Sequence, residues 1–292
     1  MGICISLKVK KHKLMKNHVT AGLLLLALMV TFPIYAQRKP RIKGNRSVIS
    51  VEKPLPSFSH LVLSDAFELN LQEGTETAIR IEADDNLIDI LRFEVEGDTL
   101  RVDSFYRITS SKKLGLTLVY QELHSIRAEA GSIACDQPLK ADRLDLELQG
   151  GARMQLNIKA ALVDLRMVEN TWADLRVQAD SLHASLQGYT DAHIYSSGGD
   201  IDVAMTGLAS LGLEGVSPGL TASLTDNASL KASGIRAESA TVLLNTSATA
   251  HVYATSDLAY EGRGNARLYV YGQPGIRILG LFDRAELHKV PE

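Results

Sequence analysis

Acidic side chains recur at a fixed spacing in the middle of the chain, where they could act together. Asp145, Asp164, His183 and Asp202 follow one another at a constant step of 19 in the sequence. If residues at this step stack, these side chains form one outward column, and three acids in line could bind a cation or a basic partner. The alternative is a solvated face whose charge is partly offset by neighbours such as Arg143. The solvated face is the favoured interpretation, so no metal ligand is assigned.

A second column has the character of a ligand-binding face. Arg176, Tyr195 and Glu214 also follow one another at a step of 19. Trp172, the only tryptophan, and Tyr189 lie at neighbouring corners of the same repeat. Carbohydrate-binding solenoids use aromatic and polar side chains on a flat sheet, although such ladders also simply stabilise stacked strands. These five residues are therefore a hypothesis for a ligand face.

The remaining reactive groups do not form a catalytic set. Asp84 and Asp85 are adjacent, and neighbours on a strand point in opposite directions, so they indicate a turn rather than an acid–base pair. Cys135 would need a histidine base beside it, and a small buried core residue is the favoured interpretation. Cys4 lies in a segment that we expect to be removed. The sequence predicts no catalytic residue and no cofactor, and the protein is not expected to be an enzyme.

Composition narrows the class of protein and of partner. Apolar residues make up 45% of the chain and aromatics only 5%, so the core must be built from small aliphatic side chains. Residues 1–36 contain five Lys and no Asp, Glu or Arg, which leaves 26 basic and 34 acidic residues, a net charge of −8, in the remainder. An acidic chain without a basic stripe is a poor match for nucleic acid.

The first residues have the features of an export signal. Five lysines between Lys8 and Lys16 precede an apolar run from Ala21 to Val30, followed by Pro33 and Ala36. The run is about ten residues long, whereas a bilayer-spanning helix needs about 20. We therefore predict a signal peptide cleaved after Ala36, with Met15 as the alternative start of translation. The mature chain is expected in the periplasm, on the outer-membrane surface or outside the cell, without a transmembrane helix.

A repeat with a period of 19 organises the centre of the chain. Alternating apolar triplets recur at this step, as expected of half-buried strands. The triplets are Leu144, Leu146, Leu148; Val163, Leu165, Met167; Leu182, Ala184, Leu186; Ile201, Val203, Met205; and Leu220, Ala222, Leu224. A second strand repeats at the same step, through Met154, Ala173, Ala192, Leu211 and Leu230.

The turn between the two strands repeats as well. One position favours residues that tolerate a left-handed backbone, and a position slightly further along is uniformly small. The first column is Gly150, Glu169, Gly188, Gly207, Asp226, Asn245 and Gly264, and the second is Ala152, Thr171, Thr190, Ala209, Ala228, Ser247 and Ala266. The apolar register slips by one position near Ala240 and recovers by Leu258, which predicts an insertion balanced by a deletion, each in a turn.

Two strands per fixed step predict an all-β parallel solenoid in which each repeat is one coil. Each strand would pair with its equivalent in the next coil, about 4.8 Å away. Up-and-down hairpins are the competing interpretation, but their turns alternate between ends and need no matching corners. We expect a right-handed coil, by the rule for parallel crossovers. The strands from Phe58 to Leu118 are less regular, and they are expected to cap the solenoid or form its first coils.

The sequence divides into four predicted parts. Residues 37–56 hold six basic side chains and three prolines, which indicates a flexible tether. The predicted segments are a signal peptide at 1–36, the tether at 37–56, a solenoid domain at 57–280 with an irregular part at 57–122 and regular coils at 123–280, and a tail at 281–292.

Four stretches resemble one family of bacterial envelope proteins. They are FSHLVLSDAFELNLQEG, IRIEADDNLIDILRFEVEGDTLRV, the ladder of Gly-rich corners, and YEGRGNARLYVYGQPGIRI. Together they resemble the putative auto-transporter adhesin, head GIN domain family, over Phe58 to Ile278. The family's repeated Ser-Gly-Ser-Gly-Asp corner is degraded here, for example to Asn-Thr-Trp-Ala at 170–173. The motifs are structural turns, so the resemblance implies a fold rather than an activity.

The resemblance and the repeat together imply a non-catalytic scaffold of the cell envelope. A regular solenoid offers a long flat surface that suits adhesion, or binding of a surface glycan or an envelope protein. Two other functions remain open at this point, a glycan-active enzyme on a β-helix and a sensory or regulatory module of the envelope. The ligand and the oligomeric state do not follow from the sequence.

Overall fold

The computed structural model describes residues 39–291, and the unit from Pro40 onward has its own continuous core. Strands from its N-terminal part are β1 (Arg41–Lys43), β2 (Val48–Pro54), β3 (His60–Leu63), β4 (Glu68–Glu73), β5 (Ala78–Asp84), β6 (Leu91–Glu96), β7 (Thr99–Ser104), β8 (Arg107–Ser110) and β9 (Leu114–Tyr120), with the short helix α2 (Asp85–Ile88). The predicted signal peptide at 1–36 lies outside the described residues.

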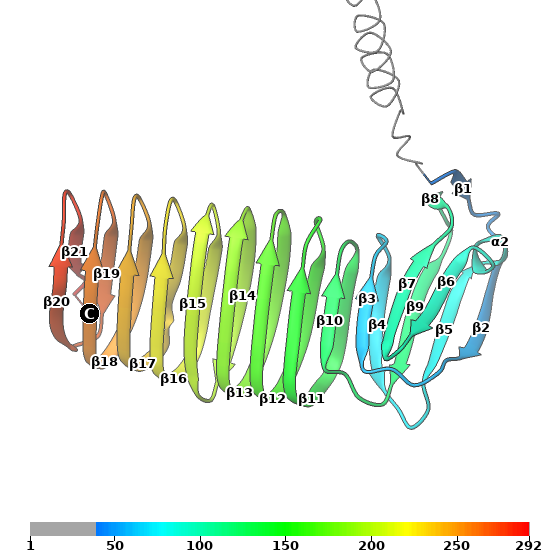
Figure 1. Ribbon diagram of the computed structural model, residues 1–292, viewed down its shortest axis with the longest axis horizontal. Coiled ribbons are helices and arrows are strands. Elements are labelled where there is room, and N and C mark those ends of the chain that lie inside the picture. The colour runs from blue at the N-terminus through cyan, green and yellow to red at the C-terminus, as the bar shows by residue number, and fades with distance from the viewer. Residues whose placement is uncertain (1–38, 292) are drawn as a thin grey trace, which may run out of the picture. The chain divides into compact units, whose positions relative to one another are not determined.

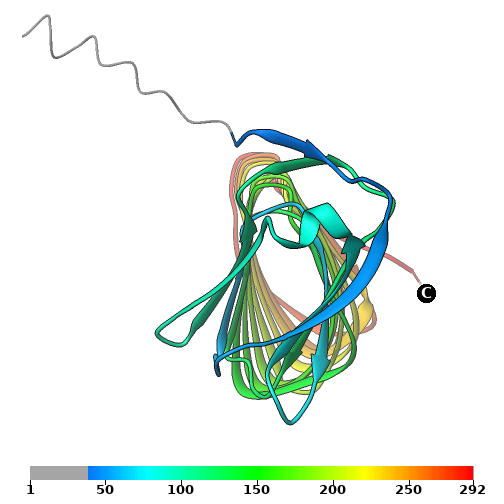
Figure 2. The ribbon, with the colours of Figure 1, turned by 90° about the vertical axis from the view of Figure 1, so that its right-hand side faces the viewer.

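The coils that follow are made of long strands that bend between two faces. They are β10 (Ser125–Ala128), β11 (Ser132–Leu148), β12 (Arg153–Val168), β13 (Thr171–Gly188), β14 (Thr190–Ser197), β15 (Asp200–Gly207), β16 (Ser210–Leu224), β17 (Ser229–Leu244), β18 (Thr249–Gly262), β19 (Arg267–Tyr271), β20 (Gly275–Leu281) and β21 (Glu286–Lys289). Figure 1 shows them stacked side by side from β10 to β21, and the end view in Figure 2 shows that each coil is a flattened loop.

Parallel pairing at the predicted step confirms the all-β solenoid. Leu144 pairs with Val163, and Met154 with Ala173, and the same step of 19 continues through β13, β15 and β16. The inward side chains of both faces are buried, and they are almost all Leu, Ile, Val, Met and Ala. Because the two inner faces lie close together, small aliphatic side chains fill the space and large rings are not needed. The right-handed sense of the coil stays a prediction.

The register slip lies where the sequence indicates it, close to one corner of the coil. In the pairing of β16 with β17, Leu211 faces Leu230 at a step of 19, whereas Leu220 faces Ala240 at a step of 20. In the next pairing the step falls to 18, as between Ala240 and Leu258. An extra residue in one coil is thus removed in the following one, and the core columns stay aligned.

The corner columns explain the Gly, Asp and Ala pattern of the sequence. Backbone φ is positive at Gly150, Glu169, Gly188, Gly207, Asp226, Thr246, Gly264 and Asp283. Two positions in the predicted columns are therefore wrong by one place, because the slip carries into this corner. Thr246 takes the left-handed position instead of Asn245, and the fully buried Ala248 takes the small position instead of Ser247.

Acidic side chains at the corners also tie neighbouring coils together. The backbone N–H of Gly150 donates to Glu169 Oε2 at 3.1 Å, and that of Gly207 donates to Asp226 Oδ2 at 3.2 Å. The N–H of Gly264 donates to Asp283 Oδ2 at 3.1 Å in the same way. A corner acid thus accepts the N–H of the corner one coil before it, an orphan donor that would otherwise depend on water.

The N-terminal part continues the stack and then closes it. β3 and β4 pair in parallel with β10 and β11, and β7 and β9 pair in parallel with β3 and β4. Antiparallel strands then take over, because β6 pairs with β7 and β5 pairs with β9. In Figure 2, α2 lies across this end of the coil stack. The less regular N-terminal cap expected from the sequence is confirmed.

Residues assigned to a flexible tether are ordered instead. β2 pairs antiparallel with β5 along its whole length, from Val48 opposite Asp84 to Pro54 opposite Ala78. Val51 packs against the core. The tether prediction is therefore wrong from Arg41 onward, because an edge strand tolerates the Lys and Pro residues that suggested disorder. The predicted tail is also wrong in part, since β21 pairs with β19.

A buried carboxylate holds the cap in place. Asp84 is fully buried and accepts backbone N–H groups from Arg46 and Lys112, each at 3.1 Å, and from Lys113 at 3.3 Å. Burial favours a raised pKa, but these hydrogen bonds and the Lys112 charge hold the pKa of Asp84 below its ordinary value of 3.8. Asp85 lies on α2 instead, so the two acids form no pair, as the sequence indicates.

A glycine substitution series will test the corner geometry. Gly150 and Gly97 have nearly equal φ, +63° and +61°, so alanine is equally strained at both. A methyl group at Gly150 would lie 2.3 Å from the carbonyl oxygen of Glu129, whereas one at Gly97 meets nothing within 4 Å. Gly97→Ala should cost about 1 kcal/mol of unfolding free energy, and Gly150→Ala about 2 kcal/mol more. Equal denaturation midpoints for the two variants would contradict this packing.

Acid titration will test the Asp84 anchor. The folded pKa is depressed, so the stabilisation by the Asp84 carboxylate is complete above about pH 4 and is lost as the pH falls through the folded pKa. We expect Asp84→Asn to be less stable at pH 6 and to approach the wild type below pH 3. The measurement is the unfolding midpoint in urea across this range, with Asp85→Asn as the exposed neighbouring control. A constant difference between Asp84→Asn and wild type across the range would refute the linkage.

Candidate functional site

Three of the proposed ligand residues meet on the outer surface of one sheet. We call this surface the Trp172 face; it is formed by the strand segments that follow the left-handed corner and carries Trp172, Arg176, Tyr195 and Glu214. Arg176 on β13 pairs with Tyr195 on β14, which pairs with Glu214 on β16. Tyr195 is 48% exposed, and within residues 39–291 neither its hydroxyl nor the Arg176 guanidinium has a hydrogen-bond or ion-pair partner. Both groups are therefore available to a ligand.

Trp172 and Tyr189 lie nearer the corner. Trp172 is half-buried on β13, in register with Arg153 and Asp191, and it lies on the same outward side as Arg176. Tyr189 is 67% exposed in the corner itself, one coil from Leu208, which is 58% exposed. Leu208 was not predicted as a ligand residue, although a step of 19 from Tyr189 reaches it. The structure thus places all five predicted residues on or beside one face, and their role in binding stays a prediction.

A histidine links two acids on this face. His193 lies 3.9 Å from Asp174 through Nδ1 and 3.3 Å from Glu214 through Nε2. Glu214 is thus already engaged by a neighbour, in contrast to Arg176. The polar surroundings of Tyr195 are therefore a mixture of occupied acids and an available cation, which suits a ligand rich in hydroxyl groups or bearing an acidic group.

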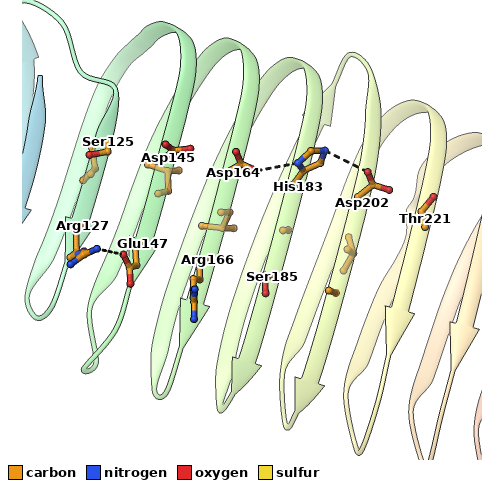
Figure 3. Close-up of a pocket in the computed structure, with 16 residues that line it drawn as sticks. Ser125, Arg127, Asp145, Glu147, Asp164, Arg166, His183, Ser185, Asp202 and Thr221 are labelled. Carbon is orange, nitrogen blue, oxygen red and sulfur yellow. Dashed lines mark hydrogen bonds and ion pairs between the residues drawn. The ribbon is translucent and has the colours of Figure 1, made fainter.

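The opposite surface, the His183 face, carries the column of acids and an open groove of about 590 Å³. Figure 3 shows Asp145, Asp164, His183 and Asp202 in line across adjacent coils. His183 Nδ1 lies 3.0 Å from Asp164 and its Nε2 lies 3.5 Å from Asp202. Arg143 pairs with Asp145 at 3.0 Å and also contacts Asp164. Each acid of the column thus has a basic neighbour within ion-pair distance, although the acids outnumber these neighbours.

The same groove gives no sign of a metal centre. Within residues 39–291, no three His, Cys, Asp or Glu side chains are arranged to hold a metal ion. A second ion pair, Arg127 with Glu147 at 2.7 Å, lies beside the acid column in Figure 3. Exposed pairs of this kind contribute little stability individually, typically under about 1 kcal/mol. The basic side chains Arg143 and His183 nevertheless each contact two acids on different strands.

An aromatic ladder that the repeat did not predict lies near the C-terminus. His251, Tyr269 and His288 stack on successive coils of the Trp172 face, with ring centroids 4.5 Å and 4.9 Å apart. The step here is 18 and then 19, so a strict period of 19 overlooks the ladder. Burial and Lys231 lower the pKa of His251. The faces of these rings are occupied by one another, so the ladder serves the fold and is less suited than Tyr195 to stack on a ligand.

Cys135 is a core residue, as the sequence indicates. It is only 6% exposed, and its thiol lies 3.1 Å from the carbonyl oxygen of Gln137 and 3.5 Å from that of Leu71. Burial raises the pKa of the thiol, although hydrogen bonds with Gln137 and Tyr120 partly offset the effect. A protonated, buried thiol beside carbonyl oxygens is unsuited to nucleophilic attack.

Comparison with known proteins now identifies the family. The model of the putative auto-transporter adhesin, head GIN domain family matches residues 57–197 and 173–274, which together make up more than half of the chain. The chain belongs to this family. No curated protein sequence is significantly similar to it. The residues that carried the resemblance in the sequence lie within the matched region, except for the last four, 275–278.

Solved structures share the fold at low sequence identity. A putative adhesin from Parabacteroides merdae is 14% identical with a TM-score of 0.60, and a putative adhesin from Parabacteroides distasonis is 15% identical with a TM-score of 0.59. A putative lipid binding protein from Parabacteroides distasonis is 18% identical with a TM-score of 0.57. Each comparison covers 86% of this chain and 100% of the other. At this identity the head GIN chain shares their fold, and their ligands do not transfer.

The environment of Cys135 leads to a direct chemical test. In the chain from Gln37 onward Cys135 is the only cysteine, so a thiol reagent reports on it alone. We expect the folded protein to react with an aromatic disulfide reagent at pH 8 at least about a hundredfold more slowly than the unfolded protein, because the thiol is buried and its pKa is raised. Rapid labelling of the native protein would show that the thiol is accessible and would reopen its assignment as a core residue.

Proposed function

We propose that the protein is a non-catalytic binding module of the bacterial cell envelope that holds an extended glycan on the Trp172 face. The supporting observation is the pair formed by Arg176 and Tyr195, which lie side by side on adjacent strands with no partner among the described residues. A tyrosine ring offers an apolar surface with a polar tip, and a guanidinium offers five donors in a fixed plane. This combination suits the alternating apolar and hydroxyl surfaces of a sugar chain.

The fold supports this proposal through its rigidity. Because each outward residue is fixed by the register of parallel strands, the Trp172 face holds its side chains in place before a ligand arrives. Preorganisation lowers the entropy cost of binding. Exposed Tyr189 and Leu208 extend the same surface to the corner, so that a linear ligand could contact several coils at once. Many weak contacts along a polymer then add up to useful affinity.

A glycan-active enzyme is the less favoured function. Hydrolysis of a glycoside needs a carboxylic acid and a carboxylate held at a suitable separation. The aligned acids of the His183 face are engaged by Arg143 and His183. The family name points to adhesion rather than catalysis. We therefore infer that the charged side chains along the groove stabilise the stacked strands and do not form a catalytic centre.

The proposed location follows from the N-terminal sequence and the family. Residues 1–36 have the order of features of a signal peptide, and the family is named for auto-transporter adhesins. Among the residues the structure describes, no helix has the length and hydrophobicity needed to cross a membrane. We propose that the chain is exported and acts in the periplasm or at the cell surface.

Binding measurements with two point variants will test the site. The chain from Gln37 onward would be screened on a glycan and polysaccharide array, and the best ligand titrated by calorimetry. Tyr195→Ala and Arg176→Ala should each weaken binding at least about tenfold, which corresponds to about 1.4 kcal/mol. Tyr106→Ala is the matched control, because Tyr106 is 38% exposed and lies in the N-terminal part of the fold.

The alternatives give different results in the same experiment. Binding that survives both variants would place the ligand elsewhere, with the His183 face as the next candidate. Cleaved products would overturn the non-catalytic assignment. Failure of every glycan to bind, with the folded state confirmed by circular dichroism, would refute the glycan proposal and leave a protein partner to be sought.

A further inference from the structure

The N-terminal end of the coil stack carries a positive charge that the rest of the molecule does not share. Residues 40–51 and 104–121 contain six basic side chains and not one Asp or Glu. The rest of the chain from Gln37 onward holds 20 basic and 34 acidic residues, a net charge of −14. The two basic segments are far apart in the sequence, which is why no basic stripe is visible there.

The fold brings these two segments together. β1 and β8 pair in parallel as a separate two-stranded sheet, which lies beside α2 at the N-terminal end of the stack in Figure 1. Beyond this sheet the N–H of Gly44 donates to the carbonyl oxygen of Ser110 at 2.8 Å. The buried Asp84 then accepts N–H groups from both segments, at Arg46 and Lys112. Two basic stretches of chain are thus fixed side by side.

The outer face of the small sheet is cationic. Arg41 pairs in register with Arg107, and Ile42 pairs with Ile108. Ile108 packs against the core, so the two arginines, which occupy the alternate positions, point away from it. Lys43 follows on the same side as Arg41, and all three basic side chains are exposed. The sheet therefore presents three cations to the solvent.

The pairing of two arginines is unfavourable for the fold itself. Within residues 39–291, the guanidinium groups of Arg41 and Arg107 have no hydrogen-bond or ion-pair partner. Like charges on neighbouring strands repel each other. Where acids are paired in the same way, at Asp145 and Asp164, Arg143 contacts both of them. The described chain supplies no such counter-charge to Arg41 and Arg107, so the pair suits an anion from outside.

Acids that border this sheet are engaged elsewhere. Glu82 on β5 pairs with Lys113 at 3.4 Å, and the side chain of Asn45 donates to Asp85 on α2. Asp84 is buried and accepts backbone N–H groups. None of these acids forms an ion pair with the arginines of the outer face, which therefore keeps its positive charge.

An exposed phenylalanine lies beside the cations. Phe105, in the short connection between β7 and β8, is 55% exposed, and the guanidinium of Arg92 lies 5.2 Å from the centre of its ring. An exposed ring adds nothing to the binding of a phosphate ion in water. At a bilayer, by contrast, an aromatic ring enters the boundary between headgroups and acyl chains while basic side chains contact anionic headgroups. The combination of ring and cations therefore indicates a lipid surface.

We propose that the Arg107 patch, formed by Arg41, Lys43, Arg107 and Phe105, docks the protein on an anionic phospholipid bilayer. Each planar guanidinium matches phosphate oxygens with two parallel hydrogen bonds. The net charge of −14 on the rest of the chain from Gln37 onward opposes contact through other parts of the molecule, so the coil stack meets the bilayer at its N-terminal end. The patch is separate from the Trp172 face, and docking does not depend on glycan binding.

The test is vesicle flotation with the chain from Gln37 onward, which lacks the apolar run of residues 1–36 that could itself insert into a bilayer. Wild-type protein should bind vesicles of phosphatidylcholine that contain about 30% phosphatidylglycerol, and it should not bind vesicles of phosphatidylcholine alone. Raising the salt concentration from about 0.05 M to about 0.5 M should release it, because screening shortens the range of the attraction.

Single charge reversals separate docking from stability. Arg41→Glu and Arg107→Glu should each lower the partition coefficient onto the anionic vesicles about tenfold. Each variant replaces a pair of like charges by an ion pair, so its unfolding midpoint in urea should equal or exceed that of the wild type. Arg236→Glu is the matched control, because Arg236 on β17 is also exposed and its reversal changes the net charge equally. It should bind as the wild type does.

Phe105→Ser tests whether the contact reaches the bilayer boundary, and it should weaken binding at least about threefold. Failure of the wild type to bind the anionic vesicles would overturn the proposal, as would equal binding by Arg41→Glu and Arg236→Glu. Release of the wild type by an excess of soluble glycerol phosphate at constant ionic strength, or unchanged binding by Phe105→Ser, would refute docking on a bilayer and assign the patch to a soluble phosphate ligand.

Discussion

The whole structure depends on one constraint, the parallel hydrogen-bonded register that sets each residue beside its equivalent in the next coil. Because of this register, residues that are one repeat apart in the sequence stack on one another in adjacent coils. Inward columns must then be apolar and of compatible size, and corner columns must tolerate a left-handed backbone or be small. Outward columns that carry acids need basic neighbours, as Arg143 is to the adjacent Asp145 and Asp164. Further along the same column, His183 lies between Asp164 and Asp202.

Much of this architecture could be predicted because every repeat needs the same types of residue at equivalent positions, so the pattern recurs several times in the sequence. The triplets beginning at Leu144 and the small corner residues beginning at Ala152 specify strands, corners and pairing direction together. The prediction failed where the repeat ends. β2 carries the basic and proline residues of a flexible segment, yet it is ordered by pairing with β5 and by the buried Asp84, which are distant from it in the sequence. The composition of a short segment does not reveal contacts with residues that are distant in the sequence.

The candidate site was predictable to a different degree. The step of 19 was enough to place Arg176, Tyr195 and Glu214 in one row, and their register in the sheet agrees. It could not show which charges already have partners. Only the folded structure shows that His193 engages Glu214 while Arg176 stays available within the described chain. The aromatic ladder of His251 and Tyr269 was overlooked for another reason, because the extra residue in one coil and its removal in the next change the local step.

A step of 20 between two coils is followed by a step of 18 between the next two. This pair of changes shows how the fold accommodates a coil that is one residue too long. The coil with the extra residue bulges near one corner, and the next coil is one residue shorter. The core columns of the following coils therefore stay aligned with those before. Small insertions are thus confined to a single layer, while the addition of one complete layer would leave every other contact as it was. Such a molecule can grow by duplication of a coil, lengthening by about 4.8 Å each time. The length of the coil stack can therefore change during evolution while its two ends stay the same.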